Sequence, residues 1–97
     1  MTDASTRDVI RRKLTESLAP VHLEIVDQSH LHAGHAGARS GGGHYEVTIA
    51  SDMFEGLGPA QRHRLVYKAL AAEMNREIHA LALVTLTPEE WRLRVTD

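Results

Sequence analysis

The spacing of apolar residues predicts a helix at the start of the chain and two strands after it. Three apolar residues recur at every fourth position between residues 5 and 18, and Ser5 and Asp8 fit a capping pattern at the start of this helix. After Pro20, which ends the helix, the apolar period changes to two over residues 21–25 and again over 45–49, as in strands with one buried face. The apolar positions are Ile10, Leu14 and Leu18 in the helix, Val21, Leu23 and Ile25 in the first strand, and Tyr45, Val47 and Ile49 in the second.

A second helix and a third strand follow. Pro59 suits the first turn of a helix, where its missing N–H costs little, and the helical spacing continues to about Asn75. Residues 78–86 are nearly all apolar, which indicates a buried strand. Because a helix connects it to the second strand, we expect the third strand to run parallel to the second.

A short helix is predicted at the C-terminal end. Thr87 and Glu90 fit a capping box with Pro88 at the first helical position, and this helix can bring Trp91 onto the core. The element order is therefore αββαβα, an α+β fold with a three-stranded mixed sheet and helices packed on one face. The length of 97 residues fits a single domain over residues 1–97, with a core from about residue 7 to residue 91.

The connection between the first two strands, residues 28–43, is rich in Gly, Ala, Ser and His and far longer than a hairpin turn needs. Connections of this length in a small domain are usually functional or disordered. Four of the seven histidines, at positions 30, 32, 35 and 44, fall within fifteen positions. His30 and His32 share one side if the chain stays extended, which suits a metal. Each of them taken alone is better interpreted as a polar linker residue, and no spacing matches a zinc motif.

His79 stands at the start of the third strand, among the most apolar residues of the chain. A polar ring there is costly unless it is hydrogen-bonded or bound to a ligand. From the spacing alone, a half-buried histidine with satisfied hydrogen bonds is the more common outcome. A role as a ligand needs a further argument.

Composition narrows the possible chemistry. The net charge is −2 and there is no cysteine, so the chain has no overall attraction for nucleic acid or anionic membranes and supplies no thiol nucleophile or thiolate ligand. No apolar run approaches the roughly 18 residues that span a bilayer, and residues 1–8 lack a signal-peptide core, so we expect a cytoplasmic protein without membrane contact. Ser51 and Asp52 near a histidine come with no nucleophile elbow or oxyanion site, so we expect no enzyme activity.

Three cations stand in the second predicted helix, at Arg62, Arg64 and Lys68. Cations early in a helix oppose its macrodipole, so Arg62 and Arg64 do not serve helix stability. They form either a surface that grips a partner's carboxylates or a phosphate, or a solvated face whose stems pack on neighbours. His63, between the two arginines, is interpreted as structural, bonded to the backbone of the preceding connector.

Five blocks of residues form a pattern along the chain. They are Asp-Gln-Ser-His-Leu-His at 27–32, Phe-Glu-Gly at 54–56, Gln-Arg-His-Arg-Leu-Val-Tyr at 61–67, Ile-His-Ala-Leu-Ala-Leu at 78–83 and Thr-Pro-Glu-Glu-Trp at 87–91. In their order and separation these blocks resemble the BolA family, over about residues 7 to 91, and the Arg-His-Arg-Leu-Val and His-Ala-Leu blocks are specific. The resemblance implies a fold similar to class II KH domains, in agreement with the element order above.

The resemblance also implies a partner and a cofactor. BolA-like proteins form heterodimers with monothiol glutaredoxins and share a bridging 2Fe–2S cluster, in iron–sulfur cluster trafficking or iron homeostasis. The family's pattern matches His79 and His32 as ligands, and the other ligands are the glutaredoxin cysteine and a glutathione thiol, so this chain alone holds no cluster. His30, His35 and His44 are rivals to His32, because the connection is rich in possible ligands. A chain without cysteine fits a cluster whose thiolates come from elsewhere.

DNA binding is the alternative function, since some BolA-like proteins are described as transcriptional regulators and KH domains grip single strands through a G-x-x-G loop. Residues 34–37 match that motif by letter, but they lie between two predicted strands rather than two helices. A local basic strip would carry the contact with phosphates. It would consist of Arg62, Arg64 and Lys68 with Arg11, Arg12 and Lys13 of the first helix.

Overall fold

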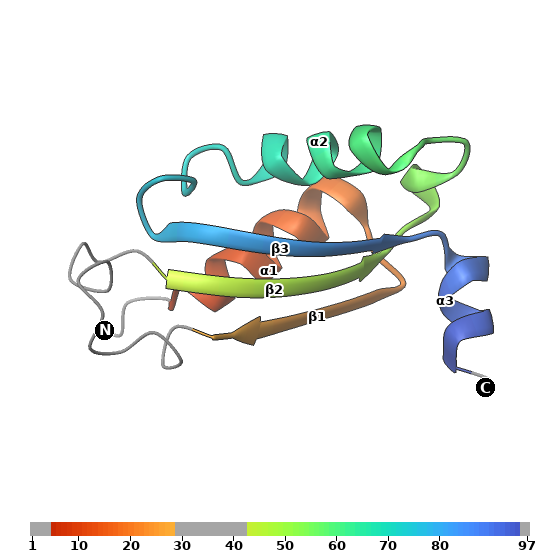
Figure 1. Ribbon diagram of the computed structural model, residues 1–97, viewed down its shortest axis with the longest axis horizontal. Coiled ribbons are helices and arrows are strands. Elements are labelled where there is room, and N and C mark those ends of the chain that lie inside the picture. Colours follow the sequence, from red (N-terminus) through yellow and green to blue (C-terminus); the bar gives the residue numbers. More distant parts are fainter. Residues whose placement is uncertain (1–4, 29–42, 96–97) are drawn as a thin grey trace.

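The computed structural model describes residues 5–28 and 43–95, and Figure 1 shows how they are arranged. In these ranges the helices and strands follow the predicted order αββαβα, with one turn of 3-10 helix, η3, added after the second strand. The elements are α1 (Thr6–Leu18), β1 (His22–Asp27), β2 (Gly43–Ala50), η3 (Asp52–Phe54), α2 (Pro59–Ala69), β3 (Ile78–Leu86) and α3 (Pro88–Val95).

Local sequence signals begin the first and last helices where predicted. The Ser5 side chain accepts a hydrogen bond from the Asp8 backbone N–H at 3.1 Å and so caps α1. At α3 the Glu90 carboxylate accepts from the Thr87 N–H at 2.8 Å, and the Thr87 hydroxyl accepts from the Glu90 N–H at 3.2 Å. This reciprocal pair is a capping box, so both predicted helix starts are confirmed.

The three strands form one mixed sheet in the order β1-β2-β3. β1 is antiparallel to β2 and β3 is parallel to β2, as the sequence predicts. α1 and α2 pack on the same face of this sheet, and Figure 1 shows α1 passing behind the strands while α3 lies beyond their end. The α+β fold with a mixed three-stranded sheet is therefore confirmed.

The core lies between α1, α2 and the covered face of the sheet. Phe54 of η3 and Val66 and Leu70 from the α2 region are fully buried and close it on one side. The alternating and helical patterns identified in the sequence supply the rest, because a residue that recurs with the period of its element stays on one face. These buried residues are Ile10, Leu14 and Leu18 of α1, Ile25 of β1, and Tyr45, Val47 and Ile49 of β2.

α2 is shorter than predicted, since it ends at Ala69 and not near Asn75. The chain then turns back toward β3: Asn75 adopts a left-handed φ of 66°, and its N–H bonds the Ile78 carbonyl at 2.9 Å. Leu70 is buried and Met74 packs against the core from within this turn. The apolar spacing therefore continues beyond the end of α2, because side chains in the turn that follows still face the core.

Two apolar side chains lie elsewhere than predicted. Val21 precedes β1 and is 57% exposed, because the strand begins only at His22. Trp91 is half-buried and does not join the core. Its ring stacks instead on the His22 ring, with the centroids 3.7 Å apart and the planes 12° from parallel. α3 therefore packs against the end of the sheet rather than over its face.

Candidate metal centre at one end of the sheet

One end of the sheet gathers the candidate ligands that the structure describes. β1 ends there and β2 and β3 begin there, because β1 is antiparallel and β3 parallel to β2. The Gln28 N–H donates to the His44 carbonyl at 2.7 Å, and the Gly43 N–H donates to the Glu77 carbonyl at 2.8 Å. The connection that carries the other predicted ligands therefore starts and finishes at the end of the sheet where His79 stands.

A β-bulge decides which way the His79 side chain points. Gly43 of β2 pairs with Ile78 of β3. The next residue of β2, His44, pairs with Ala80, so His79 is an extra residue on β3. Ile78 is fully buried, whereas His79 is exposed. Leu81 and Leu83 pack against the core, so uninterrupted alternation counted back from them would have turned position 79 toward the core as well. The prediction of a half-buried histidine, made from the spacing, is therefore wrong.

The His79 and His44 rings lie side by side. Their centroids are 5.3 Å apart and their planes are tilted by 44°. The His79 side chain makes no hydrogen bond to another described residue, so its nitrogens can serve a ligand. Within residues 5–28 and 43–95 no group of three or more His, Cys, Asp or Glu could hold a metal ion. A metal bound to this pair would take its remaining ligands from outside these ranges.

His30, His32 and His35 fall outside the described residues, as does the G-x-x-G motif at 34–37. The assignment of His32 as second ligand therefore stays a prediction. His44 is the rival that the structure brings to His79. The alternation in β2 already puts position 44 on the face opposite Tyr45, but no local pattern indicates which β3 residue lies beside it.

Arg62 holds three elements together instead of facing solvent. Its Nε donates to the Leu57 carbonyl at 2.8 Å, and its Nη1 donates to the Thr85 carbonyl at 3.1 Å and to the Glu90 carboxylate at 2.8 Å. Only 14% of the side chain is exposed. Of the two interpretations of this arginine, packing on neighbours is the one found. The bond to the connector that the sequence assigned to His63 is made by Arg62.

Arg64 and Lys68 are exposed on α2, where a partner can reach them. The predicted basic strip is nevertheless reduced. Lys13 of α1 donates to the Glu73 carboxylate at 2.5 Å, and the Glu73 side chain is 10% exposed, so this ammonium is neutralised within the fold. The cations of the strip with exposed side chains are those of Arg64, Lys68, Arg11 and Arg12.

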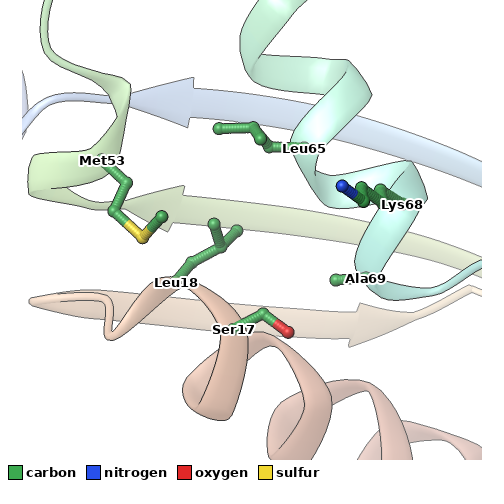
Figure 2. A pocket seen from close by; sticks show the side chains of 6 residues that line it. All are labelled: Ser17, Leu18, Met53, Leu65, Lys68 and Ala69. Atoms are coloured by element: carbon green, nitrogen blue, oxygen red, sulfur yellow. The ribbon is translucent and has the colours of Figure 1, made fainter.

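A hollow of about 450 Å³ lies between α1 and α2, and Figure 2 shows the side chains around it. Most of its lining is apolar, with one ammonium group and one hydroxyl. The lining residues are Ser17, Leu18, Met53, Leu65, Lys68 and Ala69.

Comparison with known proteins gives a family match over most of the chain. The family model for BolA-like proteins matches residues 14–90. Human BolA-like protein 1 is 47% identical to the chain over 83 residues, which are 86% of the chain and 58% of the human protein. A Vibrio cholerae protein named DNA-binding transcriptional regulator BolA is 42% identical over 86 residues, covering 89% of the chain and 78% of that protein.

The chain also resembles solved structures of the same family. A Bol-like protein from Babesia bovis superposes with a TM-score of 0.78 at 33% identity, over 98% of this chain and 99% of the other. The shared architecture therefore extends over almost the full length of both chains. By contrast, the chain spans only 58% of the length of its human relative, so the match concerns this domain and not the whole of that protein.

Proposed function

Because this chain belongs to the BolA-like protein family, we propose that it pairs with a monothiol glutaredoxin and shares a bridging 2Fe–2S cluster with it. His79 and a second imidazole are the ligands from this chain. The glutaredoxin cysteine and a glutathione thiol supply the thiolates. The role is cluster trafficking or iron homeostasis, without catalysis by this chain.

The observation that supports this proposal is the exposure of His79 next to His44 at the end of the sheet. The bulge turns the His79 ring out of the core, so another molecule can approach it. The chain contains no cysteine, and a cluster that needs thiolates must then obtain them from a partner. A cluster shared with a thiol-bearing partner accounts both for the exposed His79 ring and for the absence of cysteine.

Two residues compete for the second position. His32 matches the family's pattern, and His44 lies beside His79 in the fold. His30 and His35 stay as further rivals in the same connection. When bound, the cluster supplies one-electron chemistry, and two imidazoles on one iron raise its reduction potential above that of an all-thiolate cluster. The part of this chain is to present imidazole nitrogens, which His79 does from the start of β3 and His44 from the start of β2.

The test is to mix the protein with a cluster-loaded monothiol glutaredoxin and to follow visible absorption and circular dichroism. We expect wild type to change the spectrum and His79→Ala to abolish that change. Comparison of His32→Ala with His44→Ala identifies the second ligand, since the spectrum weakens when a ligand is removed. His63→Ala on α2 is the matched histidine control and should behave as wild type. The same spectrum for wild type and His79→Ala would contradict the ligand assignment.

A second candidate function is regulation of transcription through DNA. It is favoured by the name of the Vibrio cholerae relative, which is called a DNA-binding transcriptional regulator. Arg64 and Lys68 on α2 offer phosphate contacts. The net charge of −2 supplies no general attraction for DNA, so any contact depends on such local cations.

The human and Vibrio cholerae relatives are named a BolA-like protein and a transcriptional regulator, not enzymes. Within the described ranges, no helix has the length and apolar character needed to cross a membrane. A cytoplasmic location, which the sequence predicts, is part of the proposal.

A further inference from the structure

The two faces of the sheet are covered unequally. α1 and α2 pack on one face, and in Figure 1 no helix of the described ranges crosses in front of the other. α3 touches this second face only at its far end, where Trp91 stacks on His22. The middle of the face is therefore open to another molecule over the part of the chain that the structure describes.

Strand register determines which side chains share the open face. Glu24 of β1 pairs with Thr48 of β2, and Thr48 pairs with Val84 of β3. The next row toward the histidines is Val26, Glu46 and Ala82. These six residues are called the open face below. His44 continues the same β2 row, since positions 44, 46 and 48 alternate with the buried ones.

The open face combines acidic and apolar groups. The Glu24 side chain is 59% exposed, and Val26 is 37% exposed. Neither Glu24 nor Glu46 has a Lys or Arg side chain within ion-pair distance among the described residues, although Nε2 of His22 lies 3.8 Å from Oε1 of Glu24. Glu24 and Glu46 are diagonal neighbours across an antiparallel pair, a relation that keeps side chains within roughly 8 Å. The β3 side of the face is small, with Ala82 and Val84, so a partner's backbone can come close.

The open face itself carries no cation, since none of its six residues is Lys or Arg. Arg64 and Lys68 belong to α2, which packs on the covered face. Arg76, Arg92 and Arg94 are also exposed, but they belong to the segments that precede and follow β3. The carboxylates of the open face therefore favour a basic protein surface over the phosphates of nucleic acid as the occupant.

We propose that the open face is the docking surface for the thiol-bearing partner, and that this partner meets it with Lys or Arg side chains around an apolar centre. The inference rests on the proposed function. It adds the direction of approach: a partner seated over Glu46 lies along the same strand as His44 and next to His79. The carboxylates then fix the orientation in which the partner's thiolates reach the two imidazoles.

The test compares two charge reversals of equal size. The first is Glu24→Lys with Glu46→Lys on the open face, and the control is Glu16→Lys with Glu55→Lys, two exposed carboxylates on α1 and after η3. Affinity for a cluster-loaded monothiol glutaredoxin is measured by titration calorimetry at low and high salt. We expect the first variant to bind about tenfold or more weakly and to lose most of the salt dependence of wild type, while the control stays within about twofold.

The outcomes distinguish failure of the proposed docking surface from failure of the proposed cluster. Equal affinity of both variants and wild type overturns the docking surface and leaves the cluster proposal standing, because His79→Ala tests that independently. No binding by wild type overturns both. Sedimentation of the chain alone tests whether a second copy of this chain occupies the open face. A dimer that the open-face variant dissociates would overturn the inference. If the reversal unfolds the domain in far-ultraviolet circular dichroism, Glu24→Gln with Glu46→Gln replaces it, with a smaller loss of affinity expected.

Discussion

At the scale of the residue, Ser51 shows how one polar side chain fixes a junction. Its side chain is fully buried between the end of α1 and the start of η3. The hydroxyl donates to the Leu18 carbonyl at 2.6 Å and accepts from the Met53 N–H at 3.1 Å. The carbonyl at the end of a helix has no partner within the helix, so this serine satisfies a group that burial would leave unpaired. Its role in the fold is structural.

We expect Ser51→Ala to destabilise the domain by about 1–3 kcal/mol, since the buried Leu18 carbonyl and the partly buried Met53 N–H both lose their partner. Urea unfolding followed by circular dichroism measures the free energy of unfolding. Asp52→Ala at the neighbouring exposed position is the control and should cost much less. Equal midpoints for Ser51→Ala and wild type would remove the structural role assigned to this hydroxyl.

At the scale of the element, α3 depends on polar contacts at its first turn. It contributes no buried residue to the core. The Arg62 guanidinium and the Thr87 N–H both donate to Glu90, and these bonds lower the pKa of the Glu90 carboxyl, the arginine bond having the larger effect. The ionised carboxylate thus joins α3 to α2 and, through Arg62, to the edge of β3. The Trp91 ring on His22 is the second attachment.

The Glu90 contacts predict a pH dependence of stability. Because the folded pKa of Glu90 lies below its ordinary value of 4.5, the folded state binds fewer protons than the unfolded chain in the interval between them. The stabilisation is present above about pH 4.5 and is lost as the pH falls through the folded pKa. We therefore expect wild type to be more stable than Glu90→Gln at pH 7, and the difference to shrink toward pH 3. Urea unfolding at several pH values measures it, with Glu89→Gln as the neighbouring control. A difference that does not change with pH would falsify the ionised contact.

At the scale of the whole molecule, the sheet and the helices present opposite chemistry. The open face carries carboxylates and apolar side chains. The helical layer, formed by α1 and α2, carries the exposed cations of the predicted strip. A partner that brings thiolates to His79 and a nucleic acid would therefore approach from different sides. The two candidate functions need not compete for one surface, and substitutions on one surface can abolish one function without affecting the other.

A DNA titration at increasing salt separates them. If DNA binding is a function, affinity falls with salt, and Arg64→Ala with Lys68→Ala weakens binding to all sequences and reduces the salt slope by about two. The open-face reversal Glu24→Lys with Glu46→Lys should not weaken it. Absence of binding, or an affinity that added salt leaves unchanged, rules out phosphate contact as the function of the helical layer.

Much of the fold followed from local pattern. The bounds of β3, the two helix caps and the buried rows of α1 and β2 were predicted because each depends on neighbours a few residues away. The sequence was less informative where distant segments meet. The predicted end of α2 near Asn75 was wrong, because the apolar spacing continues past Ala69. The two interpretations of Arg62 were decided by groups 5 to 28 positions away along the chain.

The candidate site was likewise predicted only in part. By itself the sequence determined that the chain has no thiolate to offer, that histidines gather near position 30, and that another stands at position 79, because these are facts of composition and order. Only the tertiary structure decided that His79 faces outward and that His44 is its neighbour. The reason is the bulge between β2 and β3. It is an offset in the pairing of residues that lie more than thirty positions apart in the chain, and no local pattern encodes it.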